Sequence, residues 1–206
     1  VRRSASRAKP SVPRRSAGNW ACATCWKAAC AASRPTHNMG CYDLFLRALA
    51  LVSAYEKTDT FAALELLDRA IALDSRYAMA MALAAYTHAQ VVVSGWSDDP
   101  TLHRRLALDL ARRAVQLAED DSEVLSWVTG AYLPLDENFD DSIVLIDRSI
   151  ALNPGSSLAW LMSGWLRAAA GDADRAVEHF VMSMRPDPCS SDRGYQLSVI
   201  ALARFG

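Results

Sequence analysis

Small and apolar residues recur at a fixed distance along most of the chain. Four pairs of positions lie 34 residues apart: Gly130 and Gly164, Ser142 and Ala176, Ile146 and Phe180, and Pro154 and Pro188. Earlier, the phrase Arg-Ala-Ile-Ala-Leu at 69–73 returns as Arg-Ala-Val-Gln-Leu at 113–117, 44 residues later. A period of this length predicts a stack of similar helical units, and the longer spacing predicts an insertion of about ten residues.

Residues that favour helix ends mark the limits of the lengthened unit. Asp99 followed by Pro100 is typical of a helix start and predicts a helix from about 100 to 118. The insertion at 91–99 is expected to close the preceding helix and then form a loop that carries Trp96.

The residue types at the recurring positions resemble the tetratricopeptide repeat. The clearest unit, 157–190, has the diagnostic types at its fourth, eighth, twentieth, twenty-fourth and thirty-second positions, namely Trp160, Gly164, Ala176, Phe180 and Pro188. The resemblance covers about 41–206 and implies an all-α fold, an α-solenoid of antiparallel helix pairs with about four repeats plus a terminal helix. The expected units are 44–77, 78–122, 123–156 and 157–190, and the terminal helix begins near residue 191.

Close packing explains why the repeat needs these residue types. Small residues at the eighth and twentieth positions let the two helices of a unit approach, and large residues at the fourth and twenty-fourth fill the space beside them. Proline ends the second helix, because the residue before a proline avoids helical conformations. One unit cannot bury its own apolar face, so stacking is needed to build a continuous core.

The first forty residues differ from the rest in charge. Residues 1–40 contain eight Lys or Arg and no Asp or Glu, whereas 41–206 contain fourteen Lys or Arg and twenty-three Asp or Glu. This break predicts that 1–40 is a basic, disordered segment joined to an acidic repeat domain. A basic nucleic-acid domain is excluded for the larger part, and no apolar run approaches the ~20 residues of a bilayer span. We therefore expect neither nucleic acid nor membrane as a partner, and a cytoplasmic location.

The cysteines cluster near the start of the chain, at Cys22, Cys25, Cys30 and Cys41, with Cys189 far away. Cys22 and Cys25 have the spacing of half a zinc site, and Cys30, His37 and Cys41 could complete it. No second paired motif follows, so we predict no metal site.

The entry to the repeats resembles a second pattern. Arg34-Pro35-Thr36, then Cys-Tyr-Asp-Leu-Phe-Leu-Arg-Ala at 41–48, resembles the start of the repeat region in bacterial class III adenylate/guanylate cyclase-like proteins and related winged-helix transcriptional regulators. In those families a catalytic or DNA-binding domain comes first and an α/β domain follows. This chain has none of the cyclase signature. Read one nucleotide out of register, the family's α/β segment can encode residues 19–32, so our hypothesis is that residues 1 to about 33 are translated out of frame. The alternative is a genuine basic arm.

The repeats carry none of the common catalytic motifs. The chain has no Gly-rich phosphate loop, HExxH or GxSxG. His88, His103 and His179 are far apart in sequence, and a lone helical histidine rarely catalyses without a positioned partner. We therefore predict no catalytic residue and no cofactor, and that the chain is not an enzyme, although a cyclase-like parent protein would be one.

The groove lined by the first helices is the surface predicted to be functional. In tetratricopeptide arrays the second, fifth, ninth, twelfth and thirteenth positions of each unit point into it, and here they include one acidic residue and no Lys or Arg. An apolar groove suits an apolar helix or strand of a protein or peptide, including the parent's own upstream domain. The alternative is that neighbouring helices bury these residues and they bind nothing. The six proposed partner-binding residues are Tyr55, Met79, Tyr86, Trp127, Leu161 and Trp165.

Two functions agree with this sequence. The first is a protein-protein interaction or regulatory repeat module of a bacterial signalling protein, without catalysis of its own. The second is a fragment of a nucleotide cyclase that lacks its catalytic domain, or of a winged-helix transcriptional regulator.

Overall fold

The fold is built from helices alone in the part of the chain that the computed structural model describes, residues 39–135 and 139–185. This confirms the all-α class predicted from the repeats. The elements are α2 (Met39–Val52), α3 (Lys57–Leu73), α4 (Ala78–Val93), α5 (Pro100–Leu117), α6 (Ser122–Tyr132), the short 3-10 helix η1 (Leu133–Leu135), α7 (Phe139–Leu152), α8 (Ser157–Ala169) and α9 (Ala173–Ser183).

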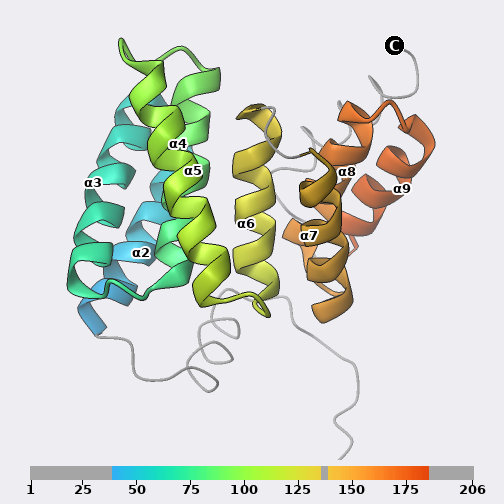
Figure 1. Cartoon of the computed structure of the whole chain (residues 1–206), viewed down its shortest axis with the longest axis horizontal. Coiled ribbons are helices and arrows are strands. Elements are labelled where there is room, and N and C mark those ends of the chain that lie inside the picture. Colours follow the sequence, from blue (N-terminus) through green and yellow to red (C-terminus); the bar gives the residue numbers. More distant parts are fainter. Residues whose placement is uncertain (1–38, 136–138, 186–206) are drawn as a thin grey trace, which may run out of the picture. The chain divides into compact units, whose positions relative to one another are not determined.

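Consecutive helices pair as antiparallel hairpins, α2 with α3, α4 with α5, α6 with α7 and α8 with α9 (Figure 1). The first helices of neighbouring hairpins also touch, since α6 contacts both α4 and α8. Each hairpin thus packs mainly on the next, which is the organisation of an α-solenoid. Four repeats are confirmed among the described residues. The terminal helix expected near residue 191, like residues 1–38, lies outside them.

Local capping fixes the limits of the lengthened hairpin. A side-chain oxygen of Asp99 accepts a hydrogen bond from the backbone N–H of Leu102 at 2.9 Å, and Pro100 occupies the first turn of α5, as predicted. The preceding helix α4 ends at Val93, and the loop after it carries Trp96. The left-handed turn of this loop falls on Gly95, whose φ is +63°.

The densest part of the core surrounds α4. Nearly every residue from Ala78 to Val91 is buried, because α3, α5 and α6 all pack on this helix. Its many alanines allow close approach from several sides, since they add little volume beyond the backbone. Helix α4 is therefore more deeply covered than a helix that lines an open groove would be.

Hydroxyl groups join α6 to α7 inside the core. Ser149 donates to the backbone carbonyl of Ser122 at 2.8 Å, and its Oγ lies 2.9 Å from the Oγ of Ser126. All three serines are buried. Because each hydroxyl has a partner, the network can fix the register of the two helices without leaving a buried hydroxyl unsatisfied.

Candidate functional site

Four of the six predicted partner-binding residues are partly buried and lie on three successive first helices. We call Tyr86 on α4, Trp127 on α6, and Leu161 and Trp165 on α8 the aromatic row. The rings of Tyr86 and Trp127 lie 5.0 Å apart at 58°. Between the helices, a Cβ on Gly130 would come within 3.0 Å of both Tyr86 and the Met162 sulfur, so this glycine lets α4, α6 and α8 meet.

The end of the row on α8 rests on the last described hairpin. Trp165 meets the ring of Phe180 edge-on, with centroids 5.4 Å apart. Leu161 packs both on the small cluster of Ala176 and Phe180 and on the one around Met162. Both side chains keep part of their surface exposed. Packing therefore holds the row in place and leaves it accessible.

The other two predicted residues lie elsewhere. Met79 is 2% exposed and belongs to the core, because α4 is covered on several sides, so the expectation that it lines an open groove is corrected. Tyr55 follows the end of α2 with a φ of +52° and is 55% exposed. Its hydroxyl lies 3.1 Å from that of Ser94, and its ring is 5.5 Å from Trp96, so it packs on the insertion rather than on the helices of the row.

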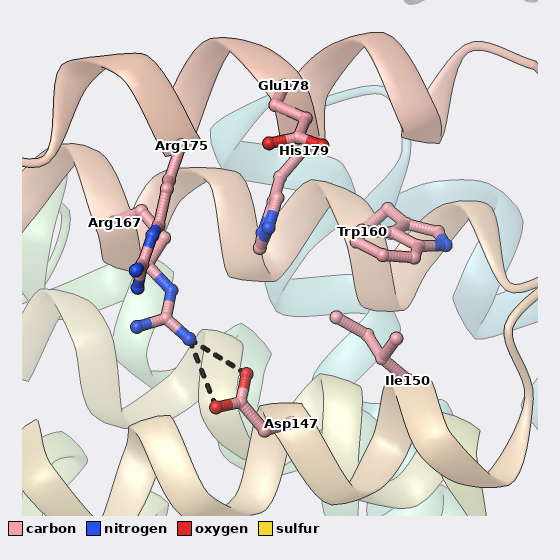
Figure 2. Close-up of a pocket in the computed structure, with 7 residues that line it drawn as sticks. All are labelled: Asp147, Ile150, Trp160, Arg167, Arg175, Glu178 and His179. Carbon is pink, nitrogen blue, oxygen red and sulfur yellow. Dashed lines mark hydrogen bonds and ion pairs between the residues drawn. The ribbon is translucent and has the colours of Figure 1, made fainter.

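A pocket of about 300 Å³ lies over α8 between the second helices α7 and α9 (Figure 2), and none of its lining residues belongs to the aromatic row. We call it the arginine pocket. Figure 2 shows Arg167, Arg175 and Asp147 together at one end and Trp160 with Ile150 at the other, with His179 between. It therefore has one charged end and one apolar end. Its lining residues are Asp147, Ile150, Trp160, Arg167, Arg175, Glu178 and His179.

An ion pair forms the charged end of the arginine pocket. One terminal nitrogen of Arg167 donates to both carboxylate oxygens of Asp147, at 2.8 and 3.1 Å. The Arg167 side chain is only 13% exposed, whereas that of Asp147 is 52% exposed. The Nε of Arg167 is buried and has no hydrogen-bond partner among the described residues. A buried N–H of a charged group without an acceptor is costly, so the hydrogen-bonding capacity of this guanidinium is not fully satisfied by Asp147.

The middle of the pocket is a histidine with an aromatic neighbour. The Nδ1 of His179 lies 2.9 Å from the Oγ of Ser163, and its ring meets Trp160 edge-on, with centroids 5.0 Å apart. Burial is the main cause that lowers the pKa of His179; Arg167 and Arg175 lower it further, while Glu178 and Asp147 raise it. Ser163 is fully buried, so this Ser–His contact has no access to a substrate and gives no catalytic nucleophile.

Two histidines that are distant in sequence meet between α4 and α5. The Nδ1 atoms of His88 and His103 lie 2.8 Å apart, so one ring must donate and the other accept. Burial, followed by the neighbouring His103, lowers the pKa of His88 to about 4. Burial also lowers the pKa of His103, against the opposing effect of Asp99. The sequence offered no sign of this pair, because it depends on how the lengthened hairpin aligns its two helices.

The described residues add little to the zinc question. No group of three or more His, Cys, Asp or Glu side chains could hold a metal ion within 39–135 and 139–185. Cys41 is fully buried, and burial, followed by the charge of Asp74, raises the pKa of its thiol. A raised pKa opposes the thiolate form that zinc requires. The other four cysteines and His37 lie outside the described residues.

None of the described helices is long and apolar enough to cross a membrane.

No protein-family model and no curated protein matches the sequence. Among solved structures, the chain is similar to a crystal structure of MamA at 20% identity over 71% of this chain and 78% of that one, with a TM-score of 0.47. It is similar to MamA from Desulfovibrio magneticus RS-1 at 20% identity over 73% and 77%, with a TM-score of 0.45. A third is YrrB, a TPR protein with an unusual peptide-binding site, at 21% identity over 78% and 76%, with a TM-score of 0.42. The repeats are evident in this chain's own hairpins and recurring positions.

Proposed function

We propose that the array is a protein-protein interaction module that binds an apolar helix or strand through the aromatic row. One observation carries this proposal: four large side chains of three successive first helices stay partly exposed after the hairpins have stacked. Aromatic side chains already held by packing lose little conformational freedom on binding, which is why they often dominate binding energy.

Charge favours an apolar partner over an anionic one at this surface. The row contains no Lys, Arg, Asp or Glu, and Tyr86 and Trp127 present ring surface to each other and to the outside. Association would then be driven by the burial of apolar area rather than by ion pairs. Such binding depends weakly on salt, because few charges are neutralised.

Two matched peptides test this proposal. One is an amphipathic helix with leucines at i, i+3, i+4 and i+7, and the other has the same composition with the leucines dispersed around the helix. The readout is the NMR shift of each tryptophan indole N–H on titration. We expect the first peptide to move the signals of Trp127 and Trp165 and the second to move neither. Equal shifts with both peptides, or shifts confined to Trp96 and Trp160, would contradict the proposal.

We further propose that the array is part of a bacterial signalling protein, whose own upstream domain is its partner. The support is the sequence resemblance at 34–48, of which Tyr42 to Ala48 lie on α2. The coding sequence upstream tests this directly. A cyclase or winged-helix domain in frame would support it, as would an α/β segment in the neighbouring frame of residues 1–33. If neither were found, the proposal of a bacterial signalling protein would lose its support.

A further inference from the structure

The arginine pocket contains more hydrogen-bond donors than the acceptors within it satisfy. Asp147 takes only one terminal nitrogen of Arg167, which leaves the buried Nε without an acceptor among the described residues. A guanidinium is always charged in a protein and presents its donors in a planar fork that matches a carboxylate. Because Arg167 is nearly buried, the attraction for an added anion is screened less than it would be in water.

A second guanidinium adds to the positive charge at the same end. The Nε of Arg175 is paired with Asp172, at 3.4 Å, and no ion pair of its two terminal nitrogens is found in the described part of the chain. Figure 2 shows the Arg175 side chain reaching from α9 toward Arg167. Glu178 also lines the pocket, but it forms no ion pair with either arginine within the described residues. Each arginine therefore has one carboxylate partner, Asp147 for Arg167 and Asp172 for Arg175, and the terminal nitrogens of Arg175 keep donors for a further acceptor.

His179 provides another donor in the middle of the pocket. The hydroxyl of Ser163 is fully buried, and its contact with the Nδ1 of His179 is the hydrogen bond that can satisfy its proton. If Ser163 donates to Nδ1, a neutral imidazole carries its proton on Nε2. The free edge of the ring then offers an N–H as well.

The apolar end of the pocket is already held in place. The indole N–H of Trp160 donates to the carbonyl of Pro154 at 2.8 Å, so the ring has no unmet polar group. With Ile150 it forms a wall beside the donors. A ligand that suits both ends combines an anionic group with an adjoining apolar one.

We propose that the arginine pocket binds the carboxylate of an Asp or Glu side chain in a partner segment, with an adjacent apolar residue of that segment packed on Trp160 and Ile150. The contact is separate from the aromatic row and does not require the row to bind anything. It differs also in chemistry, since it selects a charge where the row selects apolar surface. A partner that used both surfaces would be recognised by an apolar face and an acidic position.

The probes are two peptides that differ in one group, acetyl-Ala-Leu-Glu-Leu-Ala-amide and the same peptide with Gln in place of Glu. Their affinities are measured on the full chain from the NMR shift of the Trp160 indole N–H. We expect the Glu peptide to bind about tenfold or more tightly than the Gln peptide, as for the loss of one charged hydrogen-bond partner. Equal affinity, or no shift with either peptide at millimolar concentration, would overturn the proposal. A third peptide has Gln in place of Glu and ends in a free C-terminal carboxylate. If it bound more tightly than the Glu peptide, the pocket would prefer a chain terminus to an acidic side chain, which would overturn the proposal.

Two substitutions should move the affinity for the Glu peptide in opposite directions. Arg167→Gln removes the buried donors and should weaken binding about tenfold. Asp147→Asn removes the competing carboxylate with little change in shape and should strengthen binding several-fold. A purely structural role for the ion pair would weaken binding in both variants and would overturn the proposal.

Arg113→Gln is the matched control, because Arg113 is an exposed arginine on α5 in a local pair with Asp109. It should leave the affinity unchanged, and circular dichroism confirms the fold of each variant. Failure of this test leaves the aromatic row unaffected, since the row is read from Trp127 and Trp165 and the pocket from Trp160.

Discussion

Gly164 on α8 lies directly against the ring of Phe180 on α9. A Cβ built on this glycine would come within 2.7 Å of two ring atoms, closer than real side chains approach one another. Phe180 is fully buried, so its ring cannot swing into solvent to make room. The absence of a side chain at Gly164 is thus what allows the last described hairpin to close.

We predict that Gly164→Leu is among the most damaging single substitutions in the chain. The new side chain would overpack the contact with Phe180 and cost ~1–3 kcal/mol or more of the free energy of unfolding. The measurement is the denaturant midpoint. Gly155→Leu is the control, because a Cβ on Gly155 meets only the Asn153 side chain at 3.5 Å. An unchanged midpoint for Gly164→Leu would mean that this contact does not hold the hairpin.

The repeat phase could be predicted from the sequence because its signals are local. Asp99 with Pro100 marks a helix start by itself, and Gly164 and Phe180 recur at fixed positions of the repeat. The physical role of Gly164 was expected to be the approach of two backbones, whereas the structure shows that it makes room for an aromatic ring.

The arginine pocket could not be predicted in the same way. Asp147 and Arg167 belong to different repeats, and their contact depends on how α7 packs against α8. Arg167 has no diagnostic position in the repeat. The burial of Met79 was missed for a similar reason, since it results from several helices that pack around α4 together.

The second prediction concerns pH. The folded-state pKa of His88, about 4, lies below the ordinary value of 6.5, so the unfolded chain binds more protons between these values. Stability should therefore fall as the pH falls from about 6.5 to about 4, by up to about 3 kcal/mol from this group. The lowered pKa values of His103 and His179 act in the same direction, and the raised pKa of Asp68, caused by burial, acts against it.

Unfolding midpoints of the wild type and His88→Gln, measured across this pH range, check the prediction. The stability of the variant should depend less on pH, because the substitution removes the histidine whose pKa is lowered to about 4 and leaves Asp68 and His179 in place. Parallel curves for the two proteins would show that the pair formed by His88 and His103 does not control acid stability.

The third prediction concerns the aromatic row. Trp127→Ala should weaken binding of the amphipathic leucine peptide by ≥ ~2 kcal/mol, as is common for anchoring aromatics. Trp165→Ala should do the same, and both should affect binding more than helicity. Trp96→Ala is the control, since Trp96 lies in the insertion and its ring packs on that of Tyr55. Affinity is measured at low and high salt. Strong salt dependence, or normal binding by both folded variants, would place the peptide on another surface.

The fourth prediction is that the helices fold without residues 1–38. Helix α2 begins at Met39, and the described helices pack on one another. Deletion of 1–38 should leave the helical circular dichroism and the Tm nearly unchanged, because the packing among the described helices is retained. A loss of more than about 2 kcal/mol would instead mean that this segment contributes to the packed structure.

The nearest-neighbour packing of the hairpins also determines how the molecule opens. Helices α4 and α6 have partners on several sides, whereas α9 is packed chiefly on α8. Amide protons of α9 should therefore exchange with solvent sooner than those of α4, through partial opening of the last described hairpin. Trp160, Arg167 and His179 belong to this same hairpin. A ligand bound in the arginine pocket would slow this exchange. The exchange rate of the α9 amides would therefore report whether the pocket is occupied.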